Sequence, residues 1–74
     1  MKSHNKYRPQ LVILGKKIKY HRNLIDIKPK EMANLLEVQP NSYYKIESGE
    51  TDLSYTCLIH ISELLQVDLP ALII

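Results

Sequence analysis

Cysteine and histidine are the residue types in this chain best suited to metal binding, and Cys57 and His60 stand three residues apart. A zinc site needs three or four protein ligands, and no clear third ligand accompanies this pair. The sequence also contains no glycine-rich phosphate loop and no recognisable nucleophile signature. We therefore expect no metal, no cofactor and no catalytic residue, and we interpret this small chain as a non-enzyme that acts by binding.

The stretch from Lys28 to Gly49 has the pattern of two short helices joined by a tight turn. Pro29 and Pro40 each mark a first helical turn, where the missing N–H of proline does no harm. Apolar side chains at helical spacing give each helix one inward face: Met32, Ala33 and Leu36 in the first, Tyr43 and Ile46 in the second. The short connection forces the helices to cross steeply. This is a helix-turn-helix arrangement, whose second helix is built to enter a DNA major groove.

Three further helices are expected around this motif. The first covers residues 10–23 and has an apolar stripe at helical spacing, made of Leu11, Leu14, Ile18, His21 and Ile25. Gly15 within it suggests that another helix approaches closely. A fourth helix follows the capping residue Ser54 over residues 55–65, and a last one follows Asp68 over residues 69–73. The sequence thus predicts an all-α domain of five short helices over residues 10–74, preceded by a flexible basic arm at residues 1–9.

The charge of the 74-residue chain is distributed unevenly. Residues 1–30 hold nine bases and one acid, a net charge of +8, whereas residues 31–74 hold one base and seven acids, a net charge of −6. Such asymmetry can mark a nucleic-acid surface, and it can also simply keep a small domain soluble. The single cysteine rules out an intrachain disulfide, and no apolar run approaches the roughly 20 residues that span a bilayer. We expect a cytoplasmic protein.

Four segments together resemble the lambda-repressor-like, Xre/Cro-type helix-turn-helix domains. They are LGKKIKYHR, KPKEMANLLEV, NSYYKIESGE and LSYTCLIHISELLQVDLPALI, which lie within residues 14–73. The elements MA-x-x-L, I-E-x-G and LL-x-V rarely coincide at these spacings by chance. The resemblance implies a five-helix fold and the binding of double-stranded DNA.

The resemblance also implies roles for particular residues. Arg22 and Glu47 match an arginine of the first helix and a glutamate of the recognition helix that form a partly buried ion pair. The DNA-contacting positions fall at and near the starts of the two motif helices: Lys28, Lys30, Gln39, Pro40, Asn41, Ser42, Tyr44 and Lys45. Of these, Asn41 would pair with adenine and Lys45 would reach guanine or phosphate. The two lysines at 28 and 30 would approach backbone phosphate.

Some positions depart from the family pattern. Pro29 stands where relatives carry a polar residue, usually glutamine, that grips phosphate, and Pro40 removes a polar side chain from a typical base-contacting position. Glu37 occupies a turn position that is usually glycine, and a left-handed glutamate costs on the order of 1 kcal/mol. Asp26, in the preceding connection, also tolerates a left-handed conformation. These departures lower the expected DNA affinity and leave the expected fold unchanged.

The tail of the chain, residues 69–74, holds more apolar side chains than one short helix can bury within its own domain. We expect a symmetric homodimer whose interface contains Leu69, Leu72, Ile73 and Ile74. The alternative is that the tail completes the core of the monomer. A dimer would place two recognition helices roughly 34 Å apart and predicts a palindromic operator.

These features favour a small dimeric transcriptional regulator, a repressor, that reads the major groove with the helix Pro40–Glu47. The alternative is a protein-interaction module of the same fold, such as an antitoxin-type partner binder, with weak or no DNA binding. It is favoured by the surroundings of Lys45, the lone base of its helix, which lies near Glu47, Glu50 and Asp52. A phage-type repressor, a restriction–modification controller and an antitoxin all fit the sequence.

Overall fold

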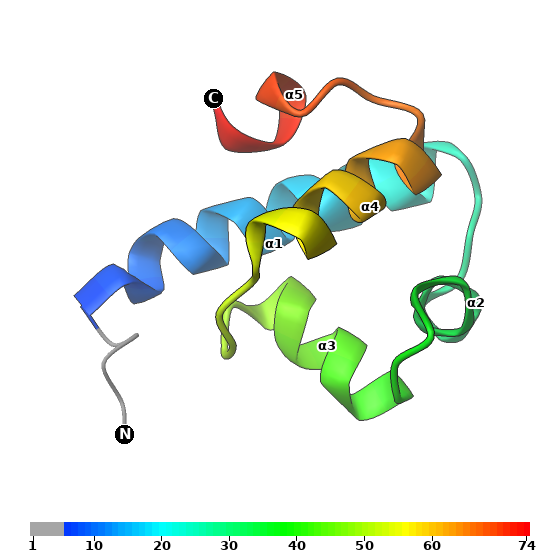
Figure 1. Cartoon of the computed structure of the whole chain (residues 1–74), viewed down its shortest axis with the longest axis horizontal. Coiled ribbons are helices and arrows are strands. Elements are labelled where there is room, and N and C mark those ends of the chain that lie inside the picture. The colour runs from blue at the N-terminus through cyan, green and yellow to red at the C-terminus, as the bar shows by residue number, and fades with distance from the viewer. Residues whose placement is uncertain (1–5) are drawn as a thin grey trace.

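The computed structural model describes residues 6–74, and in that range it contains five helices and no strand. The helices are α1 (Arg8–Leu24), α2 (Pro29–Leu36), α3 (Pro40–Ser48), α4 (Tyr55–Leu65) and α5 (Pro70–Ile73). In Figure 1, α1 runs across the molecule, with α3 below it, α4 in front of it and α5 above it. The prediction of an all-α fold with five short helices is confirmed, and the expected helix-turn-helix is formed by α2 and α3.

The beginning of α1 differs from its predicted position. The helix starts at Arg8 with Pro9 in its first turn, so the end of the expected arm over residues 1–9 is part of the helix. Proline at a first-turn position favours a helix start, and this signal, used at Pro29 and Pro40, also applies at Pro9. Lys6 and Tyr7 form a short 3₁₀ turn that leads into the helix. The remainder of the expected arm, residues 1–5, lies outside the described residues.

The core is built by all five helices. Six side chains are fully buried there: Ile18, Met32, Tyr43, Ile61, Leu65 and Leu72. Burial of one such large apolar side chain contributes about 1.5–3 kcal/mol. Leu72 is only 1% exposed, so its assignment to a dimer interface is wrong. Because α5 packs on α1, this side chain turns into the monomer core, while Ile73 and Ile74 remain exposed.

Left-handed residues end several helices and permit the short connections. Asp26 (φ 60°) and Glu37 (φ 61°) adopt the left-handed conformation that we considered tolerable there from the sequence, and Gln66 (φ 62°) does so after α4. Glu37 donates its N–H to the carbonyl of Asn34, and Val38 donates to that of Ala33, which satisfies two of the last four carbonyls of α2. These two hydrogen bonds close the end of α2 and begin the short turn to α3.

The two predicted caps have different outcomes. The Ser54 hydroxyl accepts a hydrogen bond from the backbone N–H of Cys57 at 3.1 Å, which confirms Ser54 as the cap of α4. The prediction that Asp68 caps α5 is wrong, because Leu69 occupies the position before the helix. The backbone carbonyl of Asp68, and not its carboxylate, accepts the N–H of Ala71 at 2.9 Å.

Candidate nucleic-acid interface

One side of α3 is buried and the other side is open to solvent. Tyr43 and Ile46 face the core, whereas five residues of the same helix are exposed, among them Asn41, Ser42, Tyr44 and Lys45. We call these four the polar face of α3. At the start of the helix, exposed Gln39 and half-buried Pro40 line a shallow hollow together with Asn41 and Ser42. The six positions assigned to α3 and its start therefore lie close together on the surface.

Lys28 and Lys30 lie at the start of α2, and both are exposed. Lys30 and Pro40 line one hollow between α2 and the start of α3, together with Ala33, Asn34 and Val38. No side chain caps the N-terminus of α2 or of α3. The first N–H groups of each helix are therefore available to an anion, which the helix dipole also attracts. Pro29 contributes no N–H to this set.

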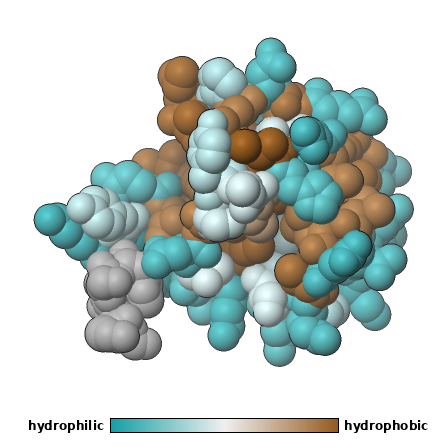
Figure 2. Space-filling view, viewed as in Figure 1, coloured by the Kyte–Doolittle hydropathy of each residue, from teal (hydrophilic) through white to brown (hydrophobic). Residues whose placement is uncertain are grey.

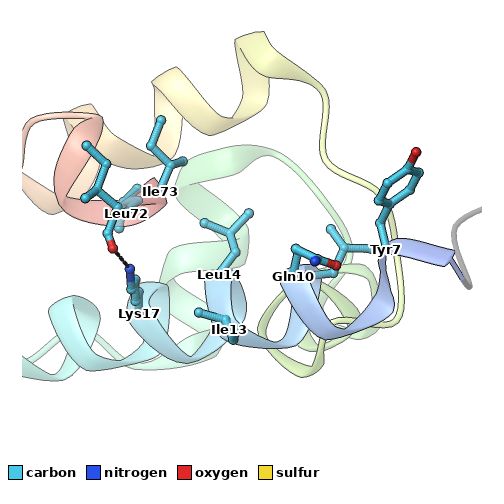
Figure 3. Close-up of a pocket in the computed structure, with 9 residues that line it drawn as sticks. Tyr7, Gln10, Ile13, Leu14, Lys17, Leu72 and Ile73 are labelled. Carbon is cyan, nitrogen blue, oxygen red and sulfur yellow. Dashed lines mark hydrogen bonds between the residues drawn. The ribbon is translucent and has the colours of Figure 1, made fainter.

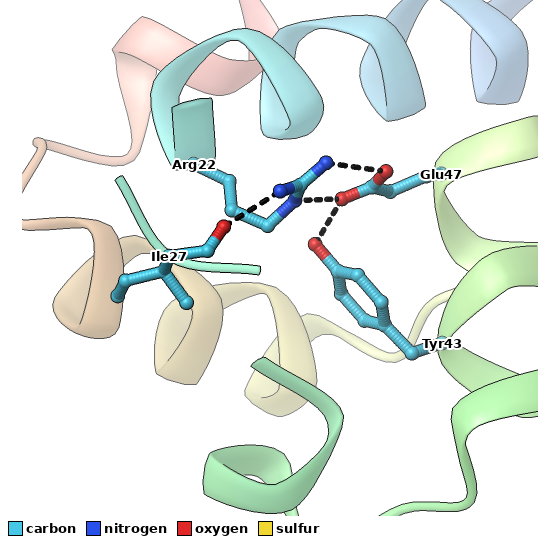
Figure 4. A network of polar contacts seen from close by, with 4 residues as sticks. All are labelled: Arg22, Ile27, Tyr43 and Glu47. Atoms are coloured by element: carbon cyan, nitrogen blue, oxygen red, sulfur yellow. Dashed lines mark hydrogen bonds and ion pairs between the residues drawn. The ribbon is translucent and has the colours of Figure 1, made fainter. Parts of the chain in front are cut away.

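The polar side chains of Arg22, Tyr43 and Glu47 form a network behind α3 (Figure 4). Arg22 on α1 donates from Nε to Glu47 Oε2 at 2.6 Å and from Nη2 to Glu47 Oε1 at 3.3 Å. Its Nη1 donates to the carbonyl of Ile27 at 2.6 Å, and the Tyr43 hydroxyl donates to Glu47 Oε2. The predicted Arg22–Glu47 ion pair is therefore present in the structure. Its hydrogen bond to Ile27 also ties Arg22 to the connection between α1 and α2.

Burial makes this network electrostatically strong. The side chains of Arg22 and Glu47 are 5% and 11% exposed. The hydrogen bond to Glu47 raises the pKa of Arg22, although burial opposes this shift. The pKa of Tyr43 is raised well above its ordinary value, first by burial and then by the hydrogen bond to Glu47. Sequence reasoning assigned Tyr43 only to the core, and the available signal for its polar role was its position four residues before Glu47 on one helix.

Gly15 and Gly49 allow α3 and its end to lie close to α1. A Cβ atom at Gly15 would stand 2.2 Å from the backbone carbonyl oxygen of Glu47, so any side chain there would displace α3. This close approach confirms the expectation for Gly15. Gly49 ends α3 in the left-handed conformation (φ 79°), and a Cβ atom there would stand 2.7 Å from Val12 Cα. The position of the polar face of α3 is therefore fixed by backbone packing as well as by the buried ion pair.

Apolar side chains also gather at the far side of α1 from α3, where α5 lies (Figure 2). A groove of about 370 Å³ runs between α1 and α5, and its lining includes Leu14, Leu72, Ile73 and Ile74. Lys17 closes one side of this groove by donating a hydrogen bond to the carbonyl of Ile74 (Figure 3). Leu69 is half-buried, while Ile73 and Ile74 are 55% and 88% exposed.

Cys57 and His60 lie on α4, and His60 is exposed. Within residues 6–74, no three or more His, Cys, Asp or Glu side chains are grouped in a way that could hold a metal ion. Burial raises the pKa of the Cys57 thiol, which favours the protonated and less reactive form.

The packed α2–α3 pair, the exposed polar face of α3 and the ion pair behind it are the features of a helix-turn-helix domain. A helix-turn-helix family model matches residues 18–72, and the chain belongs to this family of Xre/lambda-repressor-like DNA-binding transcription regulators. Among curated protein sequences, none matches the chain significantly. No helix in the described part of the chain is long and apolar enough to cross a membrane.

The fold is also found in a solved structure, the crystal structure of the restriction-modification controller protein C.AhdI from Aeromonas hydrophila. The two chains share 17% sequence identity and superimpose with a TM-score of 0.80, over 86% of this chain and 97% of the controller protein. At this level of identity, the similarity establishes a common fold.

Proposed function

We propose that this protein binds double-stranded DNA in a sequence-specific manner by placing α3 in the major groove, and that it acts as a repressor. The observation that carries the proposal is the contrast between the two sides of α3. Its inner side is held by a buried ion pair and a glycine contact, whereas its outer side presents amide, hydroxyl and ammonium groups to solvent. Rigid positioning of such groups is what base recognition requires.

The proposed contacts divide into base reading and phosphate binding. Asn41 would form a bidentate pair with adenine, and Lys45 would reach guanine or a phosphate. Gln39, Ser42 and Tyr44 would contact the DNA major groove next to Asn41 and Lys45. Pro40 would make van der Waals contact with the same groove. Lys28 and Lys30, next to the uncapped N-terminus of α2, would bind backbone phosphates and set the orientation of the domain.

We also propose that the protein is a homodimer that binds a palindromic operator. Leu69, Ile73 and Ile74 leave apolar surface at the end of the chain, which a symmetric copy would cover. The two copies of α3 would then read half-sites about one DNA turn apart. Leu72 is not part of this interface.

The structure weakens the argument for a protein-interaction module with little DNA binding. That argument depended on acidic side chains around Lys45, including Glu47. The Glu47 carboxylate faces inward and is bound by Arg22 and Tyr43, so it adds no negative charge to the outer surface of α3. Glu50 lies beyond the end of the helix, where it accepts a hydrogen bond from the Ser48 hydroxyl at 2.8 Å. DNA binding is therefore the better supported function.

The salt dependence of binding tests the proposed phosphate contacts. Replacing Lys28 and Lys30 with alanine should weaken binding to all duplex sequences alike and reduce the slope of log K against log salt by about 1 per lysine. Lys19→Ala on α1 is the matched control, since Lys19 is exposed outside the proposed DNA surface. Unchanged affinity and salt slope in the double variant would show that α2 does not approach the phosphates.

A further inference from the structure

Three large apolar side chains of α1 stay exposed although the core is complete. Ile13 is 55% exposed, Tyr20 is 61% exposed and Leu24 is 63% exposed. At 3.6 residues per turn, they fall within an arc of roughly 40° around the helix axis. We call these three residues the outer stripe of α1.

The outer stripe points away from the recognition helix. Gly15 and Arg22 contact Glu47 of α3, and both lie roughly 180° around α1 from the stripe. DNA on the polar face of α3 would therefore leave the outer stripe accessible. DNA binding gives no role to Tyr20 or Leu24, whereas Ile13 also lines the groove beside Ile73 and Ile74.

The outer stripe is flanked by positive charge. Exposed Lys16 lies along one edge of the stripe and half-buried Lys17 along the other, and α1 contains no acidic residue. Within residues 6–74, Arg22 is the only base of α1 that forms an ion pair. Lys17 donates a hydrogen bond to the Ile74 carbonyl and retains two further N–H donors. These lysines belong to the basic excess of residues 1–30 and lie outside the proposed DNA interface.

The charges decide which partner fits the stripe. In a symmetric antiparallel pair of outer stripes, neither copy would offer a carboxylate from α1 to Lys16 or Lys17 of the other, because α1 contains no acidic residue. Such a pair would bring lysines together without compensating charge, and like charges at an interface destabilise it. A phosphate backbone would suit the lysines but would leave the three apolar side chains uncovered. A surface with both apolar groups and carboxylates would cover the three apolar side chains and would also pair with the two lysines.

We propose that the outer stripe of α1 is a docking site for an acidic amphipathic helix of a partner protein. Apolar residues at i, i+3 or i+4, and i+7 of the partner would pack on the stripe. Carboxylates on both sides of this apolar seam would pair with Lys16 and Lys17, as charged residues do beside the apolar seam of a coiled coil. Because the stripe and the polar face of α3 lie on opposite sides of α1, the partner and DNA would bind at the same time. The docking proposal goes beyond DNA binding and does not depend on it.

The test is a selection of helical peptides, randomised on one face and displayed on phage, against the full chain. We expect the enriched peptides to carry an apolar seam with flanking Asp or Glu. In nuclear magnetic resonance titrations, they should shift the amide signals of α1 around Tyr20. The double variant Tyr20→Ala, Leu24→Ser should bind them about tenfold more weakly or worse, since it removes most of the contact area without touching the core. Tyr55→Ala on α4 is the matched control, because Tyr55 is also highly exposed.

A charge reversal makes the test specific for the proposed chemistry. The variant Lys16→Glu, Lys17→Glu should lose the selected peptides and bind versions in which lysine replaces each acidic residue. The proposal is overturned if the selection enriches nothing, or if neutral or basic helices dominate. It is also overturned if the signals of the outer stripe respond to a non-specific duplex or to anionic vesicles instead. Conversion of a dimer to a monomer by Tyr20→Ala, Leu24→Ser would identify a second copy as the occupant.

Discussion

At the scale of single residues, Tyr43 connects the hydrophobic core to the buried ion pair. Its ring is fully buried, and its hydroxyl donates to the same Glu47 oxygen that accepts from Arg22 Nε. The burial of Tyr43 could be predicted from its helical position. The one sequence signal for its hydrogen bond was the spacing of four residues from Glu47, and this signal is weak because the contact with α1 determines the side-chain conformation of Glu47. The exposed positions of α3 owe part of their orientation to this inward-facing tyrosine.

Tyr43→Phe should lower the free energy of unfolding by about 1 kcal/mol at pH 7, the usual contribution of one hydrogen bond. It should also change the response to alkaline pH. The pKa of Tyr43 is raised in the folded protein, so above pH 10 the unfolded chain loses this proton while the folded chain keeps it. Stability therefore falls as pH rises, by up to about 1.4 kcal/mol per pH unit.

Urea unfolding at pH 7 and pH 10.5 measures this difference. The wild-type protein should lose more stability between the two pH values than Tyr43→Phe. Burial also raises the pKa of Cys57, but this thiol is present in both proteins and its contribution cancels. Equal losses in the two proteins would contradict the account of Tyr43.

Removing one member of the ion pair should be costly. Glu47→Ala leaves Arg22 buried without its carboxylate, which costs about 3–5 kcal/mol, out of a total stability of about 5–15 kcal/mol for a typical domain. Thermal or urea unfolding should show this loss, with Glu50→Ala as the exposed control. Replacing both partners, in Arg22→Met with Glu47→Leu, should recover part of the stability. A change below about 0.5 kcal/mol in Glu47→Ala would show that the pair contributes only as a surface ion pair does.

At the scale of elements, helix types and most boundaries followed from local signals, whereas details that depend on packing did not. Pro29, Pro40 and Ser54 marked the starts of α2, α3 and α4, because proline and cap effects act within one turn. Pro9 is the same signal for a helix start. The prediction did not use it and therefore placed the start of α1 at residue 10, two residues too late. The direction of Leu72 depends on how α5 lies on α1, which no local pattern specifies.

The contact between α1 and α3 supports a prediction for Gly15→Ala. Alanine is the better helix former by roughly 1 kcal/mol, but its Cβ atom would overlap the Glu47 carbonyl. Overpacking typically costs about 1–3 kcal/mol, and this clash is with backbone that cannot rotate away. We expect a net loss of stability in urea unfolding and weaker DNA binding, since α3 must move. Lys19→Ala, an exposed change on the same helix, is the control, and a stabilised Gly15→Ala variant would contradict the close approach.

At the scale of the whole molecule, the polar face of α3 lies on the opposite side of α1 from the outer stripe. The outer stripe meets the tail, because Ile13 and Lys17 line the same groove as Ile73 and Ile74. Tyr20 and Leu24 lie outside that groove, so substitutions there can be made without altering the other two surfaces. The charge asymmetry of the sequence suggested a nucleic-acid surface, but Lys16 and Lys17 lie on the side of α1 that faces away from α3.

The proposed dimer predicts a clear effect of charge in the tail. Ile73→Lys and Ile74→Lys should convert the dimer to a monomer in sedimentation equilibrium, because each places an ammonium group in an apolar interface. Both variants should stay folded, since both side chains are exposed in the monomer. Leu24→Ser, an exposed change on the outer stripe, should leave the dimer intact. A wild-type protein that is monomeric at the concentrations where it binds DNA would contradict the assignment.

The most direct test of the central claim is a selection of preferred sites from a random-duplex pool at physiological salt, where non-specific binding is weak. We predict recovery of a palindrome with half-sites about one DNA turn apart. Asn41→Ala should relax the preference at one base position of each half-site and leave the other positions unchanged. A folded protein that enriches no sequence from the pool would contradict the claim that α3 reads DNA.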